Sequence, residues 1–308
     1  MSAGIAYNRA MRRNLAPLFL FALLNGCASG PTTIQVDALP NSIKTAFSVW
    51  DEKGTAIIER AEVGKPMSLP PGRYTVTRQG SMRWVWAKDV DLKKGTAVVI
   101  KLGALKVVPP EGIEENMSIQ DLQGNWVSEL DLTGKLVAAP AGTWRITAYL
   151  DKKWAWGDVT VKEGALSELA VGAIKVTVPE GTIDSGVSVH DPASGDRLSE
   201  LRPIGKPFVS RVGKIRLQSY LDITVLAASM DVAAGRVADV PLGAIRWSGA
   251  AERVELVTKE GAKARTHTFE KGKPIAAPPG AWKIAMDGKL DAILAELKVE
   301  PGAVAEAK

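Results

Sequence analysis

Few side chains in this sequence could carry acid–base or nucleophilic chemistry. The chain has two histidines, His190 and His267, and a single cysteine, Cys27. His190 precedes Asp191, and a histidine beside a carboxylate can act as a general base. His267 stands between two threonines in a polar stretch. We interpret both histidines as solvated or turn residues, and we predict no catalytic residue and no enzymatic activity.

Aspartates recur at matching places along the chain. Three precede turn glycines and three fall within a predicted strand, namely Asp51, Asp121 and Asp191, and Asp89, Asp158 and Asp231. Paired carboxylates can cleave glycosides or bind calcium. A residue that recurs in every copy of a repeat is more simply explained by a structural role such as an Asx-turn. Clustered Cys/His ligands and nucleotide-binding glycine motifs are missing from the sequence, so we predict no metal and no cofactor.

Tryptophan is the residue type that could bind a ligand, with nine Trp against five Phe and four Tyr. Trp84 and Trp86 form a Trp-x-Trp pair that Trp154 and Trp156 repeat 70 residues later. Within a pair, both rings lie on one face of a strand. Exposed indole pairs could stack on a glycan or contact a partner protein. The alternative is that the rings fill thin cores or the seams between repeats.

The orientation of these rings depends on strand regularity. In the second pair, Val159 and Val161 have the opposite parity to the tryptophans, so a regular strand with buried valines would turn the indoles outward. In the first pair, Val90 and Leu92 share the parity of the tryptophans. Either one copy contains a β-bulge or the two pairs face differently.

The first 26 residues have the layout of a secretory signal. Arg12 and Arg13 precede an apolar run from Leu15 to Leu24, which is too short to span a bilayer. After the predicted cleavage the chain has 36 basic and 34 acidic residues, because three arginines lie in the signal. No block of like charge remains, which argues against a nucleic-acid partner.

Leu24, Asn25, Gly26 and Cys27 together resemble the lipobox of bacterial lipoproteins. Asn25 departs from that pattern, in which a small residue is usual. The resemblance implies that Cys27 becomes the first residue and carries the lipid, palmitate included. Ala28 after the cysteine implies an outer-membrane location facing the periplasm. We therefore expect a lipid-anchored protein of the cell envelope.

The remaining chain repeats with a period near 70 residues. A Gly-Lys dipeptide recurs at Gly64, Gly134, Gly205 and Gly272, and a second glycine follows it each time, at Gly72, Gly142, Gly213 and Gly280. A Leu/Val-Gly-Ala step recurs at Gly103, Gly172 and Gly243. After each second glycine, large apolar residues alternate with polar ones, as at Tyr74 and Val76, which indicates half-buried strands.

These signals predict an all-β protein, a tandem array of four small antiparallel β-sandwiches. We place the signal at 1–26, the lipidated cysteine and its tether at 27–33, and the repeats at 34–103, 104–172, 173–243 and a shortened 244–308. The last strand of one repeat runs into the first of the next without a linker, bending at Gly103. With strands rising ~3.3 Å per residue, four such repeats would extend on the order of 100 Å.

The repeats resemble small transthyretin-like and carboxypeptidase-regulatory-like sandwiches and the PEGA repeat. They are most similar to tandem modules of some proteobacterial von Willebrand factor A proteins. The matching stretches include 48–51, 69–77 (Leu-Pro-Pro-Gly-Arg-Tyr-Thr-Val-Thr) and 159–164. The resemblance implies a non-catalytic envelope role and no site residues. The Asp-x-Ser-x-Ser metal motif of the von Willebrand factor A domain is missing from the sequence.

Three functions follow as hypotheses. The first is a non-enzymatic, lipid-anchored scaffold or stalk that contacts an envelope protein. The second is a glycan-binding or polymer-binding module that uses the paired tryptophans. The third, a hydrolase that uses the recurring carboxylates, has the least support.

Overall fold

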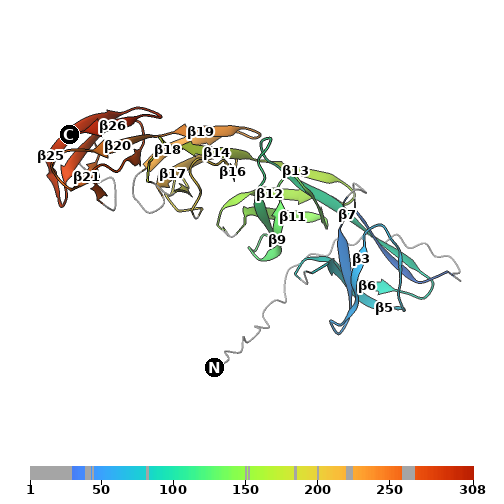
Figure 1. Cartoon of the computed structure of the whole chain (residues 1–308). Coiled ribbons are helices and arrows are strands. Elements are labelled where there is room, and N and C mark those ends of the chain that lie inside the picture. The colour runs from blue at the N-terminus through green and yellow to red at the C-terminus, as the bar shows by residue number, and fades with distance from the viewer. Residues whose placement is uncertain are drawn as a thin grey trace, which may run out of the picture.

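The computed structural model describes residues 30–38, 43, 45–80, 83–149, 151, 153–183, 186–199, 201–219, 225–258 and 268–308. The lipobox residues Leu24 to Cys27, and also His267, lie outside these residues. The regular structure of the described residues is β-strand throughout, which confirms the predicted all-β fold (Figure 1). Nowhere in these ranges is there a helix with the length and apolarity of a membrane span.

The strands form four successive groups, which we call units 1 to 4. Unit 1 contains β1 (Thr33–Ala38), β2 (Ala46–Asp51), β3 (Ala56–Glu62), β4 (Met67–Ser68), β5 (Gly72–Arg78), β6 (Val85–Leu92) and the first half of β7 (Ala97–Val108). Unit 2 contains the second half of β7, then β8 (Asn116–Gln120), β9 (Trp126–Leu132), β10 (Leu136–Ala139), β11 (Gly142–Ala148), β12 (Ala155–Val161) and β13 (Leu166–Ala170).

The other two units follow the same plan. Unit 3 contains β14 (Gly172–Thr177), β15 (Val187–His190), β16 (Phe208–Ser210), β17 (Gly213–Ser219), β18 (Val225–Val232) and β19 (Val237–Pro241). Unit 4 contains β20 (Gly243–Trp247), β21 (Arg253–Val257), β22 (Phe269–Glu270), β23 (Ile275–Ala277), β24 (Gly280–Met286), β25 (Lys289–Val299) and β26 (Val304–Ala307).

Each unit is a sandwich of two small sheets. In unit 1 one sheet has the order β4-β1-β7 and the other β3-β2-β5-β6. Unit 2 repeats this with β10-β7-β13 and β12-β11-β8-β9. Inward-facing side chains from both sheets, such as Ile34 and Val36 from one and Phe47 and Val49 from the other, are fully buried between them. This alternation is what the sequence pattern predicts for sandwich strands.

The second sheet of each unit is antiparallel, and the first sheet contains one parallel pair. In unit 1, β1 and β7 run parallel from Thr33 opposite Ala97 to Ala38 opposite Leu102. The pairs β7–β13, β14–β19 and β20–β26 repeat this arrangement. Because the first and last strands of a unit run side by side in one direction, the chain enters at one end and leaves at the other. The parallel pair therefore gives an elongated array of successive units, which is arched in Figure 1.

Strands pass between units almost without interruption. The twelve residues of β7 pair with β1 through its first half and with β10 and β13 through its second half. Only Val171 separates β13 from β14, and only Leu242 separates β19 from β20. A shared strand leaves no flexible linker, so each junction fixes the direction of the next unit.

Gly103 lies inside β7 and does not interrupt the strand. A Cβ at this position would stand 2.2 Å from the carbonyl oxygen of Lys162 and 2.6 Å from Val161 Cγ1. The equivalent glycines, Gly172 and Gly243, meet the same kind of close approach. The recurring glycine is therefore needed because a backbone turn of the same unit packs directly on the strand.

The Pro-x-Gly-x-aromatic pattern also has a structural explanation. Tyr74 donates its hydroxyl to the carbonyl of Pro70 at 2.8 Å. Trp144 and Trp282 donate their indole N–H groups to Pro140 and Pro278 in the same way. The aromatic side chain thus ties the start of the strand to the turn before it, which fixes the corner of the sandwich.

Candidate functional site

Among the described residues, buried groups of charged and aromatic side chains lie at the seams between units. At the seam of units 1 and 2, Arg78 at the end of β5 reaches Asp131 on β9. Its two terminal nitrogens donate to the two carboxylate oxygens at 2.7 and 2.9 Å, a bidentate pair. Ser128 completes the group, since its hydroxyl accepts from Arg78 and donates to Asp131, both at 2.5 Å. Asp131 is buried.

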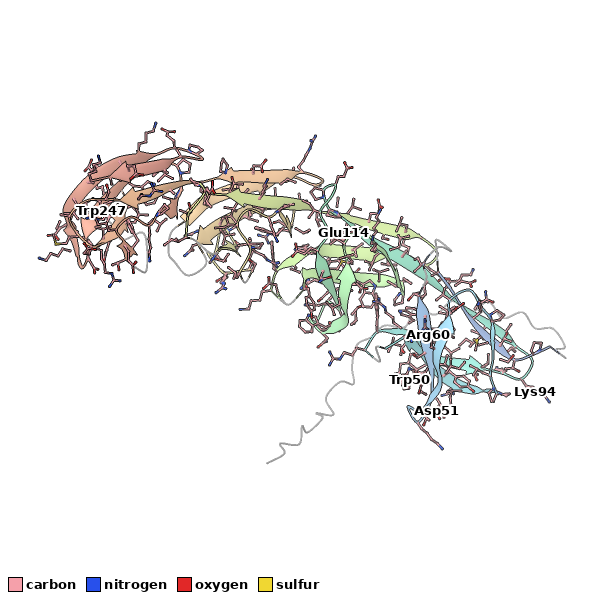
Figure 2. All side chains as sticks on the ribbon, in the orientation of Figure 1. Trp50, Asp51, Arg60, Lys94, Glu114 and Trp247 are labelled. Atoms are coloured by element: carbon pink, nitrogen blue, oxygen red, sulfur yellow. The ribbon has the colours of Figure 1, made fainter. Side chains whose placement is uncertain are left out.

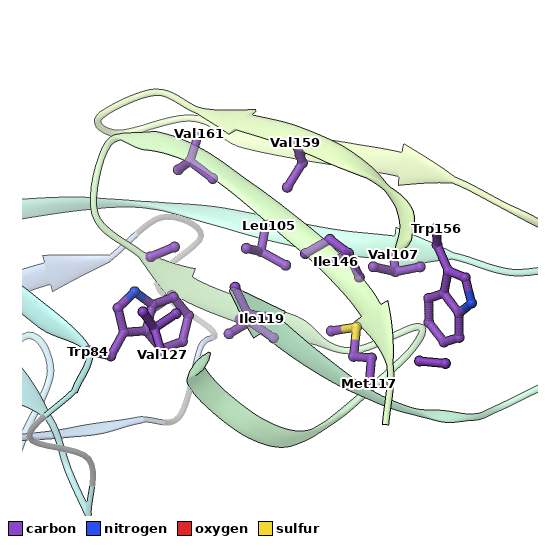
Figure 3. Close-up of a cluster of buried hydrophobic side chains, with 14 of the residues drawn as sticks. Trp84, Leu105, Val107, Met117, Ile119, Val127, Ile146, Trp156, Val159 and Val161 are labelled. Atoms are coloured by element: carbon purple, nitrogen blue, oxygen red, sulfur yellow. The ribbon is translucent and has the colours of Figure 1, made fainter. Parts of the chain in front are cut away.

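Aromatic packing supports the same seam. Trp84 of unit 1 meets Trp144 of unit 2 edge to face, with ring centroids 5.8 Å apart. The guanidinium of Arg78 lies 5.3 Å from the Trp84 ring centroid, within cation–π range. Trp84 is fully buried and belongs to the same apolar cluster as Val127 and Leu105 of unit 2 (Figure 3). The apolar core therefore crosses the seam.

The seam of units 2 and 3 is built around Arg202 of unit 3. Its Nη1 donates to Glu115 Oε1 at 2.7 Å and its Nη2 to Asp151 Oδ2 at 2.5 Å, both in unit 2. The second oxygen of Glu115 accepts from the backbone N–H of Val209 at 2.7 Å. All three charged side chains are largely buried. This seam thus contains two carboxylates for one guanidinium.

An aromatic contact accompanies this seam as well. Trp154 of unit 2 meets Phe208 of unit 3 edge to face at 5.9 Å, and Arg202 stacks 4.5 Å from the Trp154 ring centroid. Edge-to-face pairs contribute about 0.5–1.5 kcal/mol beyond the area they bury. In both seams a tryptophan of one unit meets an aromatic ring of the next unit, and an arginine stacks on that tryptophan. The arginine belongs to the tryptophan's own unit at the first seam and to the next unit at the second.

Burial changes the acidity of Glu115. Desolvation raises the pKa of this carboxyl group above its ordinary value, and the nearby Asp151 carboxylate acts in the same direction. Arg202 and the Val209 N–H oppose the shift. The net rise of the pKa follows mainly from desolvation, which outweighs the stabilisation of the charged form by Arg202 and the Val209 N–H.

The two seam groups use one position of the repeat in different ways. The residue three before each Gly-Lys dipeptide is Ala61, Asp131, Arg202 and Phe269 in units 1 to 4. The pairing of strands agrees with this alignment, since Asp131 lies opposite Met117 and Arg202 bridges Val187. The position therefore supplies a carboxylate to one seam and a guanidinium to the next. The two units that carry these residues cannot exchange places without bringing like charges together.

The four paired tryptophans are buried, which corrects the outward orientation considered for Trp154 and Trp156. The cause is a bulge in β12, where the register shifts so that Thr147 lies opposite Ala155 and Ile146 opposite Gly157. Trp156 packs with Met117 and Val107 in the core of unit 2 (Figure 3). The structure thus favours the alternative of core and seam filling, and these rings offer no exposed face to a sugar.

The first pair, Trp84 and Trp86, faces inward for the same reason. β6 has two register shifts against β5, one more than β12 has against β11. The extra bulge includes Asp89, whose φ is +56°. It absorbs the additional residue of this copy, so that both pairs point into their sandwiches.

The recurring turn aspartates form Asx-turns, as the structural interpretation predicts. Asp51, labelled at one end of unit 1 in Figure 2, accepts from the backbone N–H groups of Lys53 and Thr55 at 2.9 and 2.8 Å. Asp121 accepts from Gln123 and Asn125 in the same way. Asp191 accepts from Ala193 and Ser194. These backbone bonds, together with Arg211, lower the pKa of Asp191 below its ordinary value. At the strand position, Asp158 pairs with Arg145 at 2.9 Å.

His190 has a structural environment. It is buried, with Nε2 2.9 Å from the Ser188 hydroxyl and Nδ1 3.0 Å from the carbonyl oxygen of Gly195. Both ring nitrogens are therefore engaged, Nδ1 with the turn that follows β15 and Nε2 with β15 itself. In the part of the chain that the structure describes, no three His, Cys, Asp or Glu residues gather as metal ligands.

Sequence reasoning missed the charged residues of both seams. Arg78, Asp131, Glu115, Asp151 and Arg202 belong to none of the recurring motifs. The signal that could have found them is variation at a fixed repeat position, where Asp131 and Arg202 replace each other three residues before Gly-Lys. Residues that differ between units at one repeat position therefore indicate contacts between units. Residues that recur in every unit indicate the fold of the single unit.

Comparisons with known proteins give no family. No family model matches the chain, and no curated protein matches it. Among solved structures, the Bacillus anthracis TIE protein is 10% identical, covers 87% of this chain and 68% of its own, and has a TM-score of 0.18. The major pilin subunit BcpA of Bacillus cereus is 10% identical over 91% of this chain and 99% of its own, with a TM-score of 0.17. The pilus adhesin SpaC of Lactobacillus rhamnosus GG is 10% identical over 66% and 38%, with a TM-score of 0.17. These similarities are too low to support an argument.

Proposed function

We propose that this protein is a lipid-anchored, non-enzymatic scaffold of the cell envelope that holds its units in a fixed line for contacts with other envelope proteins. The observation that carries this proposal is the junction between units. A shared strand, a buried ion-pair group and an aromatic pair fix the second unit on the first. A second ion-pair group and aromatic pair fix the third on the second, where Val171 alone separates the strands. Such junctions restrict bending, which is what a spacer or scaffold needs.

The anchor is proposed from the sequence. Cys27 follows a charged and then apolar segment in the order of a lipoprotein signal. Lipid at Cys27 would place unit 1 next to the membrane, because β1 begins at Thr33. Units 2 to 4 would then extend away from the attachment point or along the surface.

Conversion of Cys27 to serine tests the anchor. We expect the Cys27→Ser chain to move from the membrane fraction to the soluble fraction and to keep the β-sheet circular dichroism of the parent. Ala28→Ser is the matched control and should stay with the membranes. Retention of the Cys27→Ser chain in the membrane fraction would contradict the proposed anchor.

A further inference from the structure

Each seam joins two defined faces. The back face of a unit contains the tip of its β5–β6 hairpin or the equivalent, with Arg78 and Trp84 in unit 1. The front face belongs to the unit that follows in the chain. In unit 2 it is formed by the strand β9, with Val127, Ser128 and Asp131. Wherever the described chain forms these seams, the residues of both faces are buried or partly buried by each other.

The back face of unit 4 is open. The residue six after the second glycine of the repeat is Arg78 in unit 1 and Met286 in unit 4. Met286 is 38% exposed, and Leu290 and Ile293, on the same hairpin, are similarly exposed. Figure 1 shows this hairpin, which ends in β25, at the end of the array opposite unit 1.

The front face of unit 1 is also open. The residue three after the turn glycine is Ile57 in unit 1 and Val127 in unit 2. Val127 is 8% exposed because it lies in the seam, whereas Ile57 is 45% exposed. The next position is Ile58 in unit 1 and Ser128 in unit 2. An isoleucine thus replaces the hydroxyl that bridges the Arg78–Asp131 pair.

Both end faces differ from the first inner seam at the positions of its ion pair. Arg78 corresponds to Met286, and its partner Asp131 corresponds to Ala61. Met286 is exposed, whereas Ala61 is buried in the core of unit 1, so these two positions bring no unpaired charge into a seam between the faces. Repeat proteins ordinarily present polar outer faces at the ends of an array. Ile57 and Met286 are exposed apolar residues at seam positions and suit a face that becomes covered, while exposed charged residues such as Arg60 and Lys289 lie near them in the chain.

We propose that copies of this chain associate head to tail, with the back face of unit 4 on the front face of unit 1 of a second copy. The contact is of the same kind as the seams within the chain and continues the line of units. Since it joins two different faces, it does not close and leads to linear oligomers. The contact does not require the lipid at Cys27, so the inference goes beyond the proposed anchoring and can fail independently of it.

A rival contact would join sheet edges side by side. The first half of β7 is an edge in the described structure, and its Val99 is 47% exposed. Exposed apolar edges can pair with a second chain. Ile57 and Val99 lie in the same unit and are exposed to nearly the same extent, so one substitution at each residue separates the two contacts.

The first test is sedimentation velocity of residues 28–308 over a range of protein concentrations. We expect concentration-dependent oligomers, which Ile57→Lys and Met286→Lys each weaken about tenfold or more. Val99→Lys, the matched control, should leave association unchanged. A chain that stays monomeric at every concentration would overturn the proposal. Loss of association in Val99→Lys alone would overturn it in favour of edge pairing.

The second test identifies the faces. Residues 28–308 contain no cysteine, so single cysteines can be introduced at chosen sites. We expect a short bis-maleimide to crosslink Ile57→Cys to Met286→Cys in a mixture of the two chains, and neither chain strongly to itself. Crosslinking of Met286→Cys to itself would indicate a tail-to-tail contact and contradict the proposal, as would a yield no higher than that of a Val99→Cys and Met286→Cys mixture.

Discussion

Asp131 of unit 2 and Arg202 of unit 3 occupy the same position of the repeat, yet they carry opposite charges into adjacent seams. Asp131 accepts a bidentate pair from Arg78 of the preceding unit. Arg202 donates to Glu115 and Asp151 of the preceding unit. The charges at the seams therefore fix the order of the units. If unit 3 followed unit 1, Arg202 would face Arg78 and the two like charges would repel.

Removal of Arg202 should be strongly destabilising. Arg202→Met leaves Glu115 and Asp151 largely buried with no guanidinium between them, which typically costs about 3–5 kcal/mol of unfolding free energy. Arg246→Met is the matched control, because it breaks the exposed pair with Glu306 and should cost less than about 1 kcal/mol. Chemical denaturation measures both. Equal losses in the two variants would contradict the importance of the seam.

Exchange of the charges at the first seam should rescue it. Arg78→Asp alone brings two carboxylates together, and Asp131→Arg alone brings two guanidinium groups together, so each should destabilise the chain. The double variant restores an ion pair, and we expect a coupling free energy of about 1–3 kcal/mol in the double-mutant cycle. Additive losses would show that the pair does not act as a unit.

The pH dependence of stability should reveal Glu115. Its pKa is higher in the folded chain than the ordinary 4.5, so the folded chain binds this proton more tightly than the unfolded chain does. The stabilisation from this proton is fully present below the unfolded pKa and is lost as pH rises through the folded pKa.

Comparison with Glu115→Gln tests this sign. As pH rises from about 4 to about 7, the parent should lose unfolding free energy relative to Glu115→Gln. Glu114→Gln is a suitable control, because the pair of Glu114 with Lys135 is exposed. A pH profile that is unchanged by Glu115→Gln would contradict the raised pKa.

Gly103→Ala tests the close approach between β7 and the turn that follows β12. The new Cβ would stand 2.2 Å from a backbone oxygen that cannot move independently, and overpacking of this kind costs about 1–3 kcal/mol. Gly30→Ala meets nothing within 4 Å and should be neutral. Thermal unfolding of the two variants distinguishes them. A Gly103→Ala chain as stable as its parent would show that the junction adapts.

The units could be predicted from the sequence because their signals are local and recur. Alternating apolar residues after Gly72 and the turn aspartates each depend on neighbours along the chain. The inward direction of Trp154 could not be predicted, since it depends on a bulge whose position is set by pairing with β11. The parallel β1–β7 pair could not be predicted either, because it joins residues more than sixty positions apart.

The most direct test of the central claim is small-angle X-ray scattering of monomeric residues 28–308, measured at low concentration. A rigid line of four units with a length on the order of 100 Å has a radius of gyration of about 30 Å. A compact globule of the same chain would have a radius of gyration of about 19 Å. We predict the larger value together with a pair-distance distribution that has a long tail. A radius near the smaller value would contradict the account of a linear scaffold.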